Sequence, residues 1–212
     1  MGNDLKRFIK KIFFYINKLL RKEFYAFDHF PFDSMQAMNS QNAEKALIET
    51  SLWLAKMRVR YRITDGTILG LYRNHAFIPH DNDIDIDILD PENLPTLINS
   101  FRTELKYRIG RIAVFNGKIQ QIAFYNSDNI IVDLIIWQSK EGVIVNFQEE
   151  GYLRSQEAKY FKHIDFFDFN NITYPIPGFI EEWLNFRYGN DWKIPKIYKG
   201  DWKEESGDII KL

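Results

Sequence analysis

Four aspartates stand at alternate positions between residues 81 and 87, in the run Asp-Asn-Asp-Ile-Asp-Ile-Asp. In a β-strand the side-chain period is two, so the aspartates would share one face and the isoleucines the other. Unpaired carboxylates are costly in a core, and neighbouring negative charges raise each other's pKa. A divalent cation would make the arrangement favourable, because Mg²⁺ takes carboxylate oxygens together with substrate phosphates. The alternative is a solvated strand edge that deters aggregation, but such an edge needs only one or two charges.

Asp133 is a further candidate for a role in the chemistry, because it interrupts the continuous apolar run Ile130–Trp137. Such a run predicts a buried central strand. An isolated aspartate there must be hydrogen-bonded, ion-paired or bound to a metal. If this strand lies beside the acidic strand, Asp83, Asp85 and Asp133 would reach one or two Mg²⁺ ions. A buried ion pair with an arginine is the alternative interpretation of Asp133.

A possible phosphate cradle precedes the acidic strand. Gly66 and Thr67 stand where a short strand is predicted to pass into a helix, so free backbone amides and a hydroxyl can bind a phosphate there. The Gly-Thr pair alone is a weak signal, and its spacing to Asp83 and Asp85 makes it stronger. Asp65, just before the pair, is predicted to be a turn or cap residue.

The elements that must position these residues follow from apolar periodicity and turn signals. The dipeptide Asn116-Gly117 predicts a tight β-hairpin. The mixed, aromatic-rich segment past residue 150 predicts one further helix. The expected elements are a helix capped by Ser40 or Asn42 and running to about Met57, a strand Val59–Ile63, a short helix after Thr67, the acidic strand, a helix with Pro91 in its first turn that runs to about Leu105, strands Arg108–Phe115, Lys118–Tyr125, Ile130–Trp137 and Val143–Phe147, and a helix Phe179–Tyr188.

The first 27 residues are expected to form a separate basic amphipathic helix, with residues 28–212 forming the catalytic domain and residues 28–40 reading as a linker. Residues 5–22 place apolar side chains at helical spacing and lysines and arginines on the other face. Such a helix can bind an anionic membrane surface, or it can pack on its own domain or on a second subunit. Lys10 and Lys11 interrupt any apolar core of a secretory signal.

Composition narrows the function classes. The 212 residues are enough for one sizeable domain, and 45% apolar with 27% charged residues is ordinary for a soluble globular protein. A net charge of −1 argues against a nucleic-acid partner. The chain has no cysteine, and its four histidines lack metal-ligand spacing, which argues against a zinc site. No stretch reaches the 18 or so apolar residues that a membrane-spanning helix needs.

Residues 65–86, DGTILGLYRNHAFIPHDNDIDI, resemble the signature of the LicD/fukutin-related family, which typically reads G-T-L-L-G-x-x-R-x-x-x-F-I-P-W-D-D-D-I-D. A second match lies in the segments Tyr174-Pro-Ile-Pro, Glu181-Glu-Trp-Leu and Arg187-Tyr-Gly-Asn-Asp-Trp, so the resemblance spans about residues 45–195. The chain departs from the signature at His80, where Trp is usual, and at Asn82, where Asp is usual. Neither change removes the pair Asp83 and Asp85, whereas His80 lies where it can alter substrate choice.

The resemblance implies an α+β nucleotidyltransferase fold like that of DNA polymerase beta, with a mixed central sheet and flanking helices. It implies metal-dependent transfer of a phospho-substituent, such as phosphocholine, ribitol phosphate or glycerol phosphate, from a CDP-linked alcohol to a glycan hydroxyl. Capsule, lipopolysaccharide and teichoic acid biosynthesis use such reactions. By position, Asp83, Asp85 and Asp133 match the catalytic carboxylates that hold Mg²⁺ or Mn²⁺. Gly66, Thr67 and Arg73 match the donor-phosphate site, and a plain surface arginine is the alternative for Arg73.

The expected reaction is in-line attack by a sugar hydroxyl on the β-phosphorus with CMP leaving, and with Asp133 taking the proton. The expected partners are the CDP-linked donor, a glycan or lipid-linked saccharide acceptor and an anionic membrane reached through residues 5–22. The expected location is the cytoplasm, at the inner face of the cell membrane. Two other functions stay open: an NTP-dependent nucleotidyltransferase acting on a small molecule, protein or RNA, and a non-catalytic binding module of the same fold.

Overall fold

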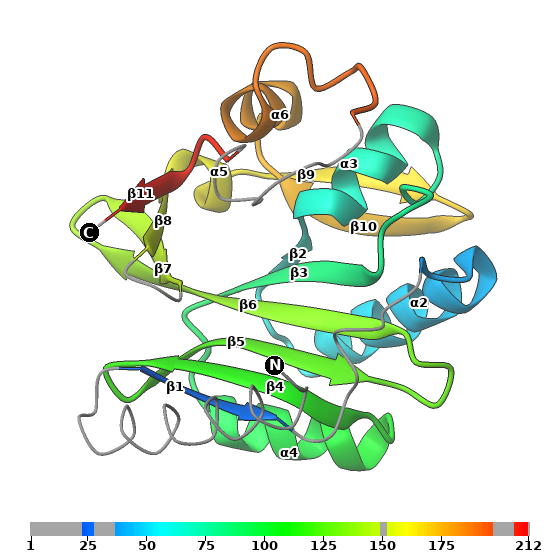
Figure 1. The fold of residues 1–212 in the computed structure, drawn as a ribbon, viewed down its shortest axis with the longest axis vertical. Helices are drawn as coiled ribbons and strands as arrows, with labels where there is room; N and C mark the ends of the chain where they lie inside the picture. Colours follow the sequence, from blue (N-terminus) through cyan, green and yellow to red (C-terminus); the bar gives the residue numbers. More distant parts are fainter. Residues whose placement is uncertain (1–22, 28–36, 149–151, 197–205, 212) are drawn as a thin grey trace, which may run out of the picture.

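A computed structural model describes residues 23–27, 37–148, 152–196 and 206–211 (Figure 1). Residues 1–22 of the predicted N-terminal helix and most of the predicted linker lie outside the described residues. The end of the predicted helix was wrong, because Glu23–Phe27 form the strand β1, which pairs with Arg111–Phe115 of the sheet. The described elements are β1 (Glu23–Phe27), α2 (Ser40–Lys56), β2 (Tyr61–Ile63), α3 (Asp65–Asn74), β3 (Asp83–Leu89), α4 (Leu94–Glu104), β4 (Arg108–Phe115), β5 (Lys118–Tyr125), β6 (Ile131–Lys140), β7 (Val143–Phe147), β8 (Tyr152–Glu157), α5 (Lys159–Lys162), β9 (Ile164–Phe169), β10 (Ile172–Pro177), α6 (Ile180–Tyr188) and β11 (Ile209–Lys211).

The strand β6 lies at the centre of a mixed sheet, as predicted. Its first part pairs in parallel with β3 and antiparallel with β5, while its last residues pair with β7. Beyond β5 the sheet continues through β4 to β1, beyond β7 it continues through β8 to β11, and β2 lies at the outer edge of β3. The hairpin β9–β10 forms a separate two-stranded sheet. The α+β class with a mixed central sheet and flanking helices is therefore confirmed.

The strand register assigns the two faces of the sheet. Ile84 of β3 stands opposite Val132 of β6, which stands opposite Phe124 of β5, and all three are fully buried. The ring of Phe101 on α4 packs 4.3 Å from that of Phe124 and 5.1 Å from that of Trp53 on α2, measured between centroids. The helices α2 and α4 therefore cover the isoleucine face. Because side chains alternate along a strand, the aspartates face the opposite side.

In Figure 1, α3, α6 and the β9–β10 hairpin lie above β2 and β3, on the side away from α4. The segments β8 to α6 and β11 complete this upper part. The β9–β10 hairpin was not predicted; it turns at Asn170 and Asn171, which both adopt positive φ, at 48° and 64°. Asparagine tolerates this left-handed region and is favoured in tight hairpin turns.

Two predicted helix starts were wrong by a few residues. The helix α2 is capped by Asn39, whose side chain accepts hydrogen bonds from the amides of Gln41 and Asn42, so neither Ser40 nor Asn42 is the cap. The helix α4 begins at Leu94, after the cap Asn93, so Pro91 precedes it. In both cases an asparagine side chain takes the free amides of the first turn. Among the described residues, no helix is both long and apolar enough to cross a bilayer.

Candidate active site

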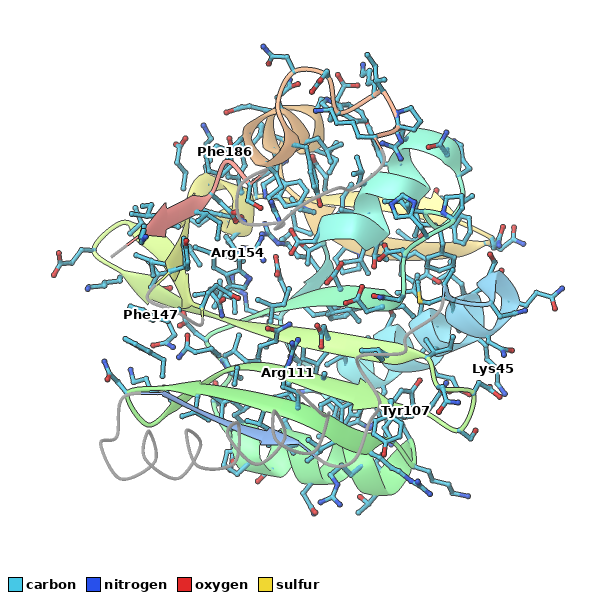
Figure 2. The ribbon with its side chains drawn as sticks, in the orientation of Figure 1. Lys45, Tyr107, Arg111, Phe147, Arg154 and Phe186 are labelled. Carbon is cyan, nitrogen blue, oxygen red and sulfur yellow. The ribbon has the colours of Figure 1, made fainter. Side chains whose placement is uncertain are left out.

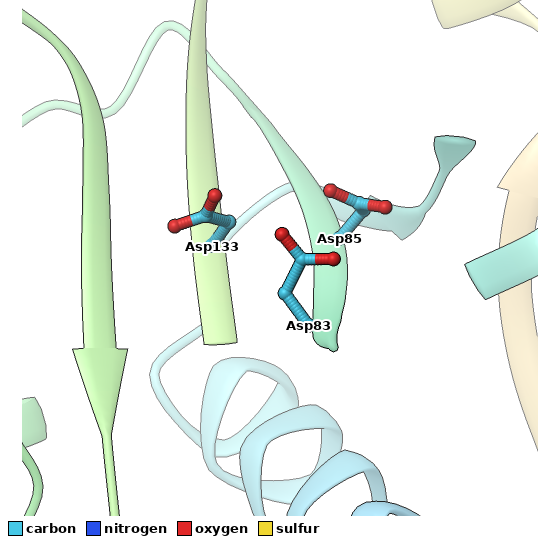
Figure 3. Close-up of side chains that lie close together, drawn as sticks. All are labelled: Asp83, Asp85 and Asp133. Atoms are coloured by element: carbon cyan, nitrogen blue, oxygen red, sulfur yellow. The ribbon is translucent and has the colours of Figure 1, made fainter. Parts of the chain in front are cut away.

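Three carboxylates meet where β3 and β6 run side by side. Asp85 and Asp133 are direct partners in the parallel register, and Asp83 lies two residues earlier on β3. Each offers an oxygen, and the three oxygens all lie within 4.8 Å of one another. Figure 3 shows the three side chains close together on the two neighbouring strands. The structure therefore brings together the three carboxylates that the sequence predicted to cluster.

The clustered carboxylates repel one another. Burial raises the pKa of Asp83 well above its usual value, and the charges of Asp133 and Asp81 raise it further. Burial likewise raises the pKa of Asp85 well above its usual value, with Asp83, Asp65 and Asp81 adding to the effect. Such a set of anions is stable when a cation or protons neutralise it.

The two oxygens of the Asp133 carboxylate have different surroundings. Its Oδ2 accepts hydrogen bonds from Arg111 Nη2 at 3.1 Å and from Gln121 Nε2 at 2.6 Å. Its Oδ1 is buried and has no hydrogen-bond partner among the described residues. Burial raises the pKa of Asp133, while Arg111 and Gln121 lower it. The predicted alternatives, an arginine ion pair and a cation ligand, are therefore compatible, because the ion pair with Arg111 uses only Oδ2.

Arg111 and Gln121 were not predicted as site residues. They come from the β4–β5 hairpin, which pairs with β6 beside Asp133. Gln121 stands two residues from Ala123, the register partner of Asp133, and so shares its face of the sheet. The sequence predicted the hairpin but gave no sign of its neighbour in the sheet. That pairing is the signal that would have found both residues.

The start of α3 adjoins the cluster. The amide of Gly66 donates to Asp85 Oδ2 at 3.1 Å, and the amide of Asp85 donates to Thr67 Oγ1 at 2.8 Å. A Cβ added at Gly66 would lie 2.6 Å from Asp81 Oδ2, so a larger residue here would have to displace the Asp81 side chain. Gly66 lines the cavity described below. Thr67 is 1% exposed and instead fastens α3 to β3.

The cluster faces a cavity of about 490 Å³. Carboxylates and arginines dominate its polar lining. The arginines come from distant segments: Arg111 from β4 and Arg154 from β8, both labelled in Figure 2, and Arg187 from α6. The predicted donor-site residue Arg73 lies outside this cavity and lines a neighbouring one. The structure therefore brings Gly66 to the carboxylates and places Arg73 further along α3.

Asp65 is more than the predicted turn residue. It opens α3 with a φ of 45°, is buried, and accepts hydrogen bonds from Arg154 Nη1 and Nη2 at 2.8 and 2.9 Å and from Arg187 Nε at 2.9 Å. Arg154 Nε also donates to Asp208 Oδ2 at 2.9 Å. This ion network ties the first residue of α3, next to Gly66, to β8, α6 and the segment before β11.

The fourth aspartate of the acidic run, Asp87, supports the fold. It is 1% exposed and accepts hydrogen bonds from Arg62 Nε at 2.8 Å and Trp137 Nε1 at 2.6 Å. Both of its oxygens are thus taken by protein donors. Asp87 therefore lies apart from the cluster of Asp83, Asp85 and Asp133. Asp81, which precedes β3, lines the cavity beside Gly66.

The mixed sheet, the helix that starts at Asp65 and the paired strand carboxylates define a nucleotidyltransferase-type domain. The family model described as LicD/FKTN/FKRP, nucleotidyltransferase domain, matches residues 58–196. The chain belongs to this family.

Proteins with known names match this chain at low sequence identity. The chain is 24% identical to "Ribitol-5-phosphate transferase FKTN" of Macaca fascicularis and 23% identical to the protein of that name of Homo sapiens, each over 187 residues that cover 84% of this chain and 39% of the relative. It therefore spans about two fifths of the length of these relatives. A crystal structure of the lincosamide antibiotic adenylyltransferase LnuA, lincomycin-bound, superposes with a TM-score of 0.49 at 17% identity, covering 66% of this chain and 84% of that one.

Proposed function

We propose that this protein transfers a phospho-substituent from a CDP-linked alcohol to a hydroxyl of a glycan. The observation that carries the proposal is the cluster of Asp83, Asp85 and Asp133, with oxygens within 4.8 Å of one another, in the wall of a cavity large enough for a small substrate. Membership of the LicD/FKTN/FKRP family supports it, as do relatives named as ribitol-5-phosphate transferases. The donor class and the glycan acceptor are part of the proposal.

The three carboxylates fit a divalent cation, Mg²⁺ or Mn²⁺. Asp83, Asp85 and Asp133 each offer an oxygen within 4.8 Å of those of the other two, and Asp133 Oδ1 is buried without a hydrogen-bond partner among the described residues. The mutual repulsion that raises the pKa values of Asp83 and Asp85 would be relieved by a cation. Bound there, the ion would neutralise charge on the donor phosphates, which is the main need of phosphoryl transfer.

Residues on the two sides of the carboxylate cluster would bind the donor and activate the acceptor hydroxyl. The start of α3 at Gly66 presents the positive end of a helix dipole to the donor diphosphate. Asp133, on the β6 side, would orient the acceptor hydroxyl and take its proton. The acceptor oxygen forms a bond to the β-phosphorus while the bond from that phosphorus to the bridging oxygen breaks. CMP leaves with the electron pair on its α-phosphate oxygen.

The proposed reaction predicts that the protein releases CMP from a CDP-linked alcohol. CDP-ribitol, CDP-choline and CDP-glycerol would each be incubated with Mg²⁺ or Mn²⁺ and a panel of glycan acceptors, and CMP would be quantified by chromatography. We expect CMP from at least one donor, with none in the presence of a chelator. Pyrophosphate from NTP without CMP from any donor would instead identify a nucleotidyltransferase. Neither product, together with no cation binding in calorimetry, would identify a binding module.

We also propose that residues 5–22 bind an anionic membrane, where a lipid-linked glycan would be available. The support is the sequence pattern, since each lysine or arginine near an anionic surface contributes about 1 kcal/mol. A chain without residues 1–24 is expected to lose sedimentation with anionic liposomes and to retain Mn²⁺ binding. Equal sedimentation of the full and shortened chains would contradict the membrane role.

A further inference from the structure

A second cavity of about 300 Å³ adjoins the first. Leu69, Ile78, His80 and Tyr188 line both cavities, so the two share a wall. The second cavity differs in chemistry, because none of the described residues that line it is a carboxylate. Its remaining lining residues are two cations, an indole and an aliphatic side chain: Arg73, Lys196, Trp192 and Ile194.

One face of α3 connects the two cavities. Gly66, Leu69 and Arg73 are spaced by three and four residues, so they lie along a single stripe of the helix. Gly66 lines the first cavity, Leu69 lines both, and Arg73 lines the second. Seven residues of helix rise by roughly 10 Å. A ligand that starts at the carboxylate cluster and follows α3 would therefore reach Arg73 after about that distance.

The guanidinium of Arg73 is fixed in place and keeps a donor for a ligand. Its Nη1 donates to the carbonyl of Trp192 at 3.1 Å and its Nε donates to Asn74 Oδ1 at 2.7 Å. Within the described part of the chain, no carboxylate pairs with Arg73 and its Nη2 has no acceptor. The side chain is half-buried at the cavity wall. An arginine whose guanidinium is held by hydrogen bonds and lacks an acidic partner is suited to binding a planar ligand with oxygen or nitrogen acceptors.

We propose that this second cavity binds the cytosine base of the donor; the inference rests on the proposed function. In an in-line displacement the attacking and leaving oxygens lie on opposite sides of the phosphorus. In the proposed reaction Asp133, on β6, lies on the acceptor side of the phosphorus. Gly66, whose amide donates to Asp85, lies on the leaving-group side. The leaving CMP therefore extends along α3 toward Arg73.

Cytosine matches the chemistry of this cavity. Its O2 and N3 atoms are both hydrogen-bond acceptors, which the free N–H groups of Arg73 Nη2 would meet. Its flat ring suits the aromatic side chain of Tyr188, which is half-buried and lines both cavities, since bases stack on aromatic rings. Among the described lining residues there is no carboxylate, which would repel these acceptor atoms. The assignment also gives Arg73 a base contact in place of the phosphate contact predicted from the sequence.

The test compares two probes that differ only in the base. Calorimetric titrations of the full chain with CMP and with ribose 5-phosphate, both with Mg²⁺, would be made for the native protein and for Arg73→Met. We expect Arg73→Met to weaken CMP binding by about tenfold or more, as for loss of hydrogen bonds from a charged group, and to leave ribose 5-phosphate binding unchanged. Arg73→Lys, which keeps the charge without the planar fork, is expected to show the same selective loss.

Arg102→Met is the matched control, because Arg102 is exposed in the last turn of α4, away from both cavities. It should leave both affinities unchanged, and thermal melts would verify that each variant is folded. Equal losses for CMP and ribose 5-phosphate would assign Arg73 to the phosphate and overturn the inference. Unchanged CMP affinity would overturn it too. If the native protein still releases CMP from a donor in that case, the proposed function stands and only the base site fails.

Discussion

Replacing Asp85 with asparagine is expected to abolish divalent-cation binding and lower turnover by about a thousandfold, equivalent to about 4 kcal/mol of transition-state stabilisation. Asparagine keeps the size of the side chain, and its oxygen can still accept the Gly66 amide. The change therefore removes the charge with little effect on packing. Calorimetry with Mn²⁺ would measure binding, and CMP release would measure turnover.

The same substitution is expected to stabilise the cation-free protein, by on the order of 1 kcal/mol. Because burial and the neighbouring aspartates raise the folded-state pKa of Asp85, protonation favours the folded state. The stability contribution of the protonated form is fully present below the unfolded value and is lost as pH rises through the raised folded-state pKa. The gain from Asp85→Asn should therefore grow with pH, which thermal melts in a chelator would show.

Asp81→Asn separates loss of a ligand from loss of charge. Asp81 lines the same cavity and carries the same charge, but it lies outside the cluster of three. We expect Asp81→Asn to retain Mn²⁺ binding and most of the turnover. Native Mn²⁺ affinity in Asp85→Asn would contradict the cation site. Equal loss of binding in both variants would assign the effect to the field of the cavity rather than to direct ligation.

The sequence was most informative where local pattern and burial agree. The alternation of aspartate and isoleucine in β3, the apolar run of β6 and the Asn116-Gly117 turn each predicted an element that the structure confirms. Asp133 was identifiable because a lone carboxylate in a buried strand needs a partner. From these local facts, the meeting of Asp83, Asp85 and Asp133 required only one further step, the parallel pairing of two strands.

The partners of these residues could not be predicted, because they depend on contacts between distant segments. Arg154 lies 89 residues from Asp65, and Arg187 lies 122 residues from it. Gln121 reaches Asp133 only through the pairing of β5 with β6. A single sequence shows that a charge must be satisfied but does not identify its partner. The predicted role of Asp65 was incomplete for this reason.

Asp65→Asn is expected to be the most destabilising single change at the site, costing about 3–5 kcal/mol, because it leaves buried arginines with too few counter-charges. Arg154 and Arg187 would keep Asp208 as their acidic partner, with Arg154 Nε 2.9 Å from one oxygen and Arg187 Nε 3.7 Å from the other. Asparagine tolerates the φ of 45° at this position, so the substitution tests the charge without adding backbone strain. Urea denaturation would measure the free energy of unfolding.

The pH dependence distinguishes this ion network from simple packing. Burial alone would raise the pKa of Asp65, but Arg154 and Arg187 outweigh it and hold the pKa well below its usual value of 3.8. The stability that Asp65 contributes is present above the unfolded pKa and is lost as pH falls toward the lowered folded-state pKa. The cost of Asp65→Asn should therefore be largest near neutral pH and shrink below about pH 4.

Asp128→Asn, in an exposed turn, is the matched control and should change stability by less than about 0.5 kcal/mol. A pH-independent cost would show that shape, rather than charge, fixes the start of α3 beside the carboxylate cluster.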